Sequence, residues 1–262
     1  MDFLTLKKDM IFQVGIDPAS VLLGVGWIVD GEVLPTLEDH DGNKLQGFKT
    51  VRAISKSGRQ HRHTRLDDLE EKLGDYLFSF PSTYINVVNV LRKQRGLDPA
   101  SWSFGNFVIE EASDHYTDPD NPDADRHDTQ YVNGLSARMA YTACRRWRDS
   151  IREGRQNGSI LFVKPDEISE NLRIHRRSAK WVRCKQVAML GGGRYEWDGQ
   201  PDEKYSGKGE CFGGELDGAN ADALDAVAAA WTAWHYWQDA QRRTMTENPS
   251  YGQKSKRRAA LK

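Results

Sequence analysis

The fold is decided by Val14-Gly15-Ile16-Asp17-Pro18-Ala19-Ser20, followed by Gly24-Val25-Gly26-Trp27-Ile28-Val29. Residues 11–17 are an apolar run of strand length that ends on the carboxylate of Asp17. Pro18 has no backbone N–H and stops the pairing, so we expect a turn and a second strand over 24–30. The two glycines of the second stretch indicate close approach of another backbone. Taken alone, Asp17 fits an ordinary Asp-Pro turn equally well.

Two later segments add acids in comparable positions. Phe107-Val108-Ile109-Glu110-Glu111 is again a short apolar strand that ends on acid. The Ala-rich stretch 220–231 predicts a buried helix with Asp222 and Asp225 three residues apart, on one face. Buried acids need a partner or a cation, and two on one face repel each other without one. Oxygen ligands of this kind suit a hard cation such as Mg²⁺.

The other elements follow from periodicity and from breaking residues. We predict a third strand over 33–54 with a polar insert at 38–43, and a central acid-bearing strand at 106–112. Pro81 should separate a helix over 66–77 from one over 84–95. Further along we predict a helix over 132–151, a strand at 159–163, a helix over 172–190 and an irregular loop over 191–219. The stripe of Trp231, Trp234 and Trp237 should be core.

Composition sets outer bounds. The chain has 262 residues and a formal net charge of −1, which argues neither for nor against nucleic acid. Residues 145–185 nevertheless carry twelve Lys or Arg against five Asp or Glu, a local excess suited to a DNA backbone or to a solvated helix face. The three cysteines are widely spaced, which disfavours a disulfide framework or a zinc site and favours a reducing cytosol. The sequence contains no run of eighteen apolar residues, the length that a membrane-spanning helix needs.

The three acidic segments together resemble a known family. Gly15-Ile16-Asp17-Pro18-x-Ser20 with Gly24-x-Gly26 resembles the first motif of RuvC-type Holliday junction resolvases, nucleases of the RNase H-like superfamily. Val108-Ile109-Glu110-Glu111 is similar to their second motif, and Asp222-Ala-Leu-Asp225-Ala-Val to their C-terminal pair of aspartates. The resemblance spans about residues 11 to 240 and agrees in order. Because Glu110 and Glu111 point to opposite faces of a strand, only one can join the cluster, and the motif selects Glu110.

The resemblance implies an α/β, RNase H-like fold with a mixed five-stranded sheet and helices on both faces. It implies a nuclease domain over 1–243, with loop insertions at about 38–65, 113–129 and 191–219, and a basic, disordered tail over 244–262. The implied chemistry is phosphodiester hydrolysis with two Mg²⁺ ions, for which Mn²⁺ can substitute. Asp17 would bridge the ions, Glu110 and Asp222 or Asp225 would flank them, and Lys180 would offset charge on the reacting phosphate.

The implied partner is a four-way junction or other branched DNA. Lys180, in Ser178-Ala179-Lys180, is the better match to the lysines that the family carries beside the site, and Lys185 is the second. The expected DNA contacts are Arg173, Arg176, Arg177, Lys180, Arg183 and Lys185. Ser113 stands where the family has a junction-opening aromatic residue, with Tyr116 further on.

A four-way junction has two DNA strands related by near two-fold symmetry, and each must be cut, so the resemblance also implies a homodimer with two sites. The location that it implies is the cytoplasm of a bacterium or of a phage-infected host. Small residues along one side of the predicted 132–151 helix fit such an interface or packing on the sheet.

Other functions remain open from the sequence. A transposase, a packaging nuclease or an RNase H acting on hybrids could share these carboxylates. A packaging nuclease normally accompanies an ATPase, and the chain has no P-loop. An actin-like sugar kinase or ATPase also opens on Gly-x-Asp, but the Asp-x-x-Asp pair has no role there. A non-catalytic DNA-architectural protein would not need the acids.

Overall fold

The computed structural model describes residues 7–19, 21–53, 61–111, 126–150, 158–176, 178, 180–191, 196–197 and 209–247. Its central sheet runs in the order β6, β2, β1, β7, β8. β2 (Leu22–Val29) is antiparallel to both β1 (Asp9–Asp17) and β6 (Phe48–Arg52). β7 (Ser101–Glu110) and β8 (Ile160–Val163) add in parallel. The mixed α/β sheet of the RNase H-like type is therefore confirmed.

The edge of the sheet beside β2 is formed by two separate segments. β3 (Glu32–Val33) pairs with one end of β2, and β6 pairs with the other end, so the sheet counts six strands instead of five. Between them the chain forms a separate hairpin of β4 (Leu37–Glu38) and β5 (Lys44–Leu45). The predicted polar insert is thus a hairpin, and much of the loop expected over 38–65 is regular structure.

Side-chain alternation along the strands decides which acids meet. In β1, Met10, Phe12, Val14 and Ile16 point to the face covered by α2 and α3, and Gly15 lies against α6 on the other face. Asp17, two residues after Gly15, falls on the side of α6. In β7, Val108 packs into the α6 core, so Glu110 falls on that side too.

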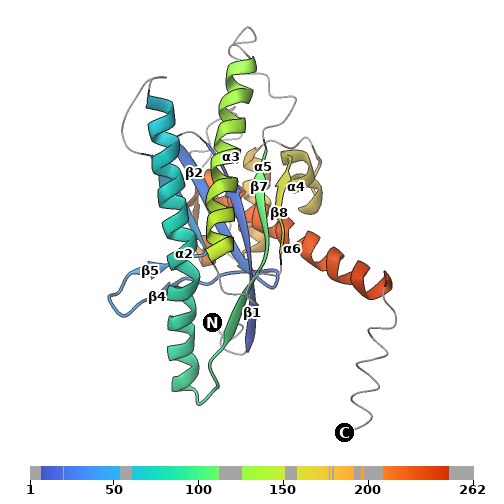
Figure 1. Ribbon diagram of the computed structural model, residues 1–262. Coiled ribbons are helices and arrows are strands. Elements are labelled where there is room, and N and C mark those ends of the chain that lie inside the picture. The colour runs from blue at the N-terminus through green and yellow to red at the C-terminus, as the bar shows by residue number, and fades with distance from the viewer. Residues whose placement is uncertain are drawn as a thin grey trace.

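The first face is covered by α2 (Arg62–Gln94) and α3 (Arg126–Ser150), both in front of the sheet in Figure 1. Contrary to our prediction, α2 continues through Pro81. A proline inside a helix costs about 3 kcal/mol. Leu77, Phe80 and Tyr84 around it are buried in the aromatic core, and burying each contributes roughly 1.5–3 kcal/mol, which outweighs that cost.

The small-residue side of α3 packs inside the chain. Ser136, Ala137, Ala140 and Ala143 are at most 6% exposed and belong to the core beneath the helix or lie beside it. Of our two readings of this stripe, packing on the sheet is correct, and this side of α3 is not available to a second subunit.

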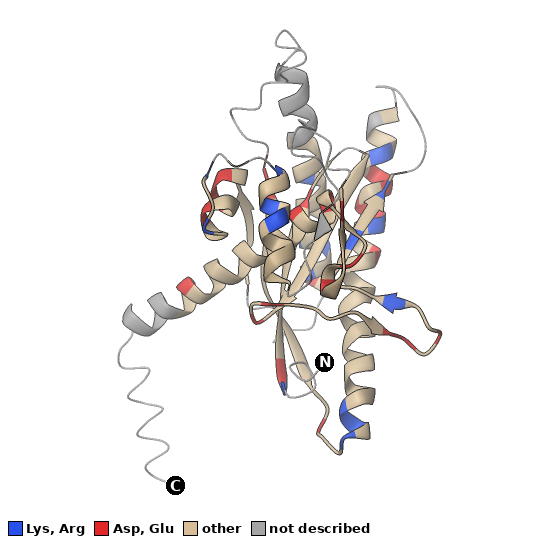
Figure 2. Cartoon of the chain, turned by 180° about the vertical axis from the view of Figure 1, so that it is seen from behind, with Lys and Arg blue, Asp and Glu red and all other residues tan. Residues whose placement is uncertain are grey.

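The second face carries α4 (Pro165–Asn171), α5 (Lys180–Leu190) and α6 (Ala221–Glu247), seen from behind the sheet in Figure 2. The single helix predicted over 172–190 is wrong in its first part. Pro165 opens α4 earlier, Leu172 is buried just after α4 ends, and Arg173 takes a left-handed φ of 59°. These turns separate α4 from α5.

The loop expected over 191–219 also contains regular structure. β9 (Glu196–Trp197), β10 (Glu210–Phe212) and β11 (Ala219–Asn220) form a small antiparallel sheet, with a short 3₁₀ turn η2 (Gly214–Leu216). Cys211, Leu216 and Ala219 are buried and anchor this segment to the α6 core. The three cysteines of the chain are buried and none is bonded to another.

α6 extends four residues past the boundary at 243 that we expected for the domain, and the remaining tail over 248–262 lies outside the described residues. Of the three tryptophans predicted to be core, Trp231 and Trp234 are partly buried and pack against the core that α6 forms with the sheet. Trp237 is also only partly buried, and it does not belong to that core. Among the described helices, none combines the length and the apolar character that crossing a membrane requires.

Glycines let α6 lie directly on the sheet. A Cβ at Gly15 would stand 2.0 Å from the backbone oxygen of Ala226, and one at Gly24 would stand 2.0 Å from that of Asp222. At Gly26 it would stand 2.3 Å from the backbone nitrogen of Val227. No side chain fits at these distances, so the glycines of the opening motif fix the height of α6 above β1 and β2.

We predict that Gly26→Ala lowers the free energy of unfolding by about 1–3 kcal/mol or more, because α6 has to move away from β2. The matched control is Gly74→Ala in α2, where no atom lies within 4 Å of the added Cβ. That change should stabilise by about 0.5–1 kcal/mol because alanine is the better helix former. Urea unfolding of both variants measures this, and equal effects would contradict the close-approach interpretation.

Candidate metal centre

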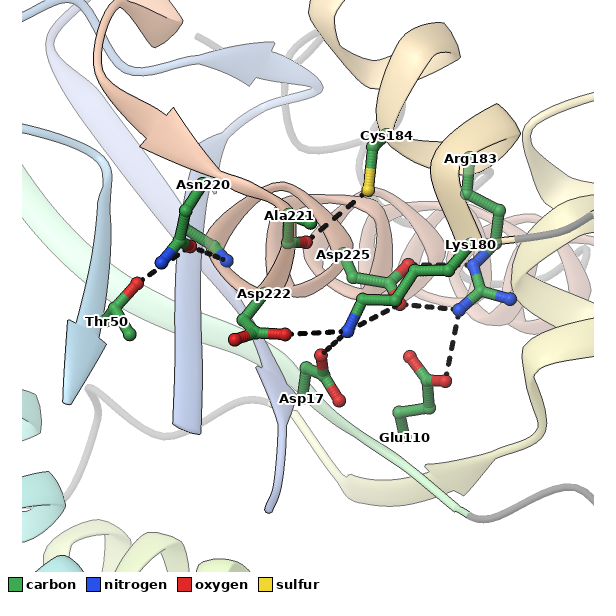
Figure 3. A network of polar contacts seen from close by, with 11 residues as sticks. Asp17, Thr50, Glu110, Lys180, Arg183, Cys184, Asn220, Ala221, Asp222 and Asp225 are labelled. Atoms are coloured by element: carbon green, nitrogen blue, oxygen red, sulfur yellow. Dashed lines mark hydrogen bonds and ion pairs between the residues drawn. The ribbon is translucent and has the colours of Figure 1, made fainter. Parts of the chain in front are cut away.

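Four carboxylates meet where β1 and β7 end and α6 begins. β1 and β7 are parallel neighbours with Ile16 paired to Ile109, so Asp17 and Glu110 leave the sheet side by side. Asp222 and Asp225 stand in the first two turns of α6, directly above. Figure 3 shows the four side chains pointing toward one another. The structure therefore brings together every acid that the sequence nominated.

The start of α6 is held by two residues that sequence analysis missed. Asn220 caps the helix, since its Oδ1 accepts from the backbone N–H of Ala223 at 2.9 Å. Thr50 of β6 donates its hydroxyl to the same oxygen at 2.9 Å. An Asn immediately before the helix is a capping signal in the sequence, but the contact with Thr50 depends on the sheet. Together they fix the turn that carries Asp222.

Lys180 lies inside the cluster, as predicted. Its Nζ is 2.5 Å from Asp17 Oδ2, 2.9 Å from Asp222 Oδ1 and 3.5 Å from Asp225 Oδ2. The ammonium thus stands among three of the four carboxylates. Its side chain remains 34% exposed, which leaves it a route to solvent.

Arg183, one helical turn further along α5, also enters the cluster. Its Nε donates to Asp225 Oδ1 at 2.7 Å and its Nη2 to Asp225 Oδ2 at 2.5 Å, a bidentate pair. The same Nη2 lies 3.2 Å from Glu110 Oε1. We had predicted Arg183 as a DNA contact, and that is corrected: its side chain is only 6% exposed and is bound to carboxylates. The signal for it was the i, i+3 spacing from Lys180.

Burial and the mutual repulsion of the acids set the protonation of the site. Burial raises the pKa of Glu110 well above its usual range, and the charge of Asp225 adds to this. Burial also raises the pKa of Asp17, more than Lys180 lowers it. Burial opposes ionisation of Asp225 as well, but Arg183 and Lys180 outweigh it and lower the pKa of that carboxyl. Glu110 is therefore the acid whose charge is compensated least.

The residues fit a divalent cation. Asp17, Glu110 and Asp225 each offer an oxygen, and the three atoms lie within 4.8 Å of one another. Glu110 Oε2 is buried and has no hydrogen-bond partner, which is costly unless a ligand satisfies it. If all are ionised, the four carboxylates exceed the charges of Lys180 and Arg183 by two, the charge of one divalent ion.

Three of the predicted DNA contacts are exposed to solvent. Arg173, Arg176 and Lys185 are exposed in the turns before α5 and on α5 itself. Arg177 lies outside the described residues, as do Ser113 and Tyr116. Of the members of the predicted basic set that the structure describes, Lys180 and Arg183 turn inward, toward the acids.

A second acidic group, Asp39, His40 and Asp41, lies in the turn of the β4–β5 hairpin. It differs from the cluster because Asp39 accepts hydrogen bonds from the backbone of Asp41 and Asn43 and from the Asn43 side chain. The bond from the Asn43 side chain holds the pKa of Asp39 below its usual value. This group stabilises the turn.

Comparisons with known proteins give structural neighbours only. No protein-family model matches the chain, and no curated protein sequence matches it. Among solved structures, the RuvC structure of Thermus thermophilus matches at 15% identity with a TM-score of 0.43, covering 86% of this chain and 95% of that chain. T. thermophilus RuvC in complex with a Holliday junction substrate matches at 14% identity and a TM-score of 0.44, covering 86% of this chain and 94% of that chain. Since identity is this low, we infer function from the carboxylate cluster.

We predict that Asp225→Asn destabilises the metal-free protein by about 3–5 kcal/mol, because the buried guanidinium of Arg183 loses its charged partner. The contact of Arg183 with Glu110 should keep the loss near the lower end. Asp222→Asn is the matched comparison: its side chain is 26% exposed and Lys180 retains two other carboxylates. Its effect should stay within about 1 kcal/mol. Urea unfolding in the presence of EDTA measures both, and the assignment fails if the two losses are equal.

Proposed function

We propose that this chain is a metal-dependent endonuclease that cuts branched DNA, with the four-way junction as its preferred substrate. One observation carries the proposal: acids from β1, β7 and α6 converge on a buried point where Glu110 Oε2 has no partner. Such an oxygen-only site suits Mg²⁺ or Mn²⁺. The exposed basic residues Arg173, Arg176 and Lys185 beside α5 support a polyanionic substrate.

The side chains have different roles in the site. Asp17, Glu110 and Asp225 would hold the cation, and Asp222 stands beside them at the start of α6. When bound, a divalent ion lowers the pKa of its water and polarises the phosphodiester. Arg183 keeps Asp225 and Glu110 in fixed orientations through its three hydrogen bonds.

Lys180 would act on the substrate. Its ammonium is held among the acids, and the carboxylates, acting against desolvation, raise its pKa well above the usual value, so it stays charged. When a cation takes the acids, this partly exposed side chain is free to face the reacting phosphate and to offset its growing negative charge.

A homodimer forms part of the proposal. Among its described residues, one chain presents one carboxylate cluster that combines acids from strands and a helix at a buried point, and resolving a four-way junction requires cuts in two symmetric strands. A two-fold dimer supplies the second site. The packed side of α3 is excluded from that interface because it is buried within the chain.

We predict that purified protein with Mg²⁺ or Mn²⁺ cleaves a synthetic four-way junction faster than duplex, flap or RNA–DNA hybrid. Asp17→Asn and Glu110→Gln should each reduce cleavage by at least about a hundredfold, since even changes around metal ligands cost 10–100-fold. Both variants should bind the junction as tightly as the wild type or more tightly, because a negative charge near the phosphate is removed. Gel cleavage and gel-shift titration measure the two properties.

The matched control is Glu111→Gln, at the acid that follows Glu110 and points to the opposite face of the strand, which should cleave normally. Ca²⁺ should support binding without cleavage. Robust cleavage by Asp17→Asn would refute the site, and a preference for hybrid over junction would replace the substrate with that of an RNase H.

We also predict paired nicking. A supercoiled plasmid with an extruded cruciform should give linear product directly, because both cuts occur within the lifetime of one dimeric complex. Agarose gels resolve linear and open-circle forms, and light scattering gives the mass with and without DNA. Accumulating open circles, together with a monomeric mass, would leave a nuclease that nicks single strands.

A further inference from the structure

The two cations in the cluster differ in how firmly they are held. Lys180 is the first residue of α5, its side chain is 34% exposed, and its ammonium is a flexible point charge. The Arg183 side chain is 6% exposed and lies on α5 near the buried residues Cys184 and Val187. It donates two hydrogen bonds to Asp225 as a bidentate pair. A guanidinium does not lose its proton in a protein. A metal ion can therefore displace Lys180, whereas Arg183 stays.

Arg183 also stands where an ion would bridge two of the acids. Its Nη2 lies 2.5 Å from Asp225 Oδ2 and 3.2 Å from Glu110 Oε1. Mg²⁺ bonds oxygen at about 2.0–2.1 Å, so an ion shared by these two oxygens would have to occupy the space of the guanidinium. The oxygen of Glu110 that remains without a partner is Oε2, on the same carboxylate.

Charge leads to the same limit. If all four carboxylates are ionised and Lys180 has been displaced, Arg183 leaves an excess of three negative charges, of which one divalent ion neutralises two. A second ion would leave a buried site with an excess positive charge before DNA arrives, which is costly in a poorly solvated position.

We infer that Arg183 is a permanent cation of this metal centre and that it restricts the chain to one divalent ion in the absence of DNA. Asp17, Glu110 through Oε2, and Asp225 would hold the ion in place of the ammonium of Lys180. Arg183 is a positioning residue, because it acts through Asp225 and Glu110. This inference rests on the proposed metal dependence and departs from the two ions that the family resemblance implies.

The experiment counts Mn²⁺ bound by the metal-free full chain without DNA. Electron paramagnetic resonance of free Mn²⁺ follows the titration, and calorimetry with Mg²⁺ repeats it. We expect one ion per chain for the wild type. Arg183→Gln, which removes the fixed charge, should bind two, and Arg183→Lys, which retains a charge, should bind one. Arg92→Gln is the matched control, since Arg92 is buried and bonded to backbone oxygens of Lys7 and Asp98. It should bind one ion.

Each outcome decides a different point. Two ions of similar affinity in the wild type would overturn this inference and leave the proposed nuclease intact. No bound ion in the wild type would overturn both. One ion in the wild type and still one in folded Arg183→Gln would show that Arg183 does not set the number. If Arg183→Gln does not fold, the wild-type count decides together with Arg183→Lys, for which two ions would overturn the role of the fixed charge.

Discussion

The close contact between α6 and the first two strands is the constraint on which the site depends. Gly15, Gly24 and Gly26 allow the helix backbone to lie where any side chain would collide with it. At that height, Asp222 and Asp225 come level with Asp17, which leaves the sheet on the same side. A larger residue at any of the three positions would lift the helix and separate its acids from those of the strands. The glycines and the aspartates therefore form one structural unit.

Bringing four acids to one buried point carries an electrostatic cost that the chain meets with its own cations. Coulomb repulsion and desolvation both disfavour ionised carboxylates here, as the raised pKa of Glu110 shows. Lys180 and Arg183 offset part of that cost, so the protein can fold before a metal ion binds. The negative charge around Glu110 Oε2 is left uncompensated, and a bound cation can stabilise it.

The positions of the acids could be predicted from the sequence. Of the two cations that bind them, only Lys180 was expected beside the acids. Strand ends and the i, i+3 spacing are local signals, so the sequence can nominate Asp17, Glu110, Asp222 and Asp225, and the structure brings these four acids together. Counting charge between 145 and 185 could not tell an exposed arginine from a buried one, since burial of Arg183 depends on how α5 docks. The path of α2 through Pro81 was missed for a related reason. Its stability comes from Phe80 and Tyr84 packing on strands far away in sequence.

The spacing of the two cations on α5 repeats the spacing of the two acids on α6. Lys180 and Arg183 are three residues apart, as are Asp222 and Asp225, and the two helices pack against each other. The charges therefore set the register of α5 on α6 as well as the chemistry of the site. If both cations were displaced by metal, α5 would lose its electrostatic hold on α6. A bidentate arginine at 183 retains that hold when Lys180 leaves, which is a physical reason for the order of the two residues along the helix.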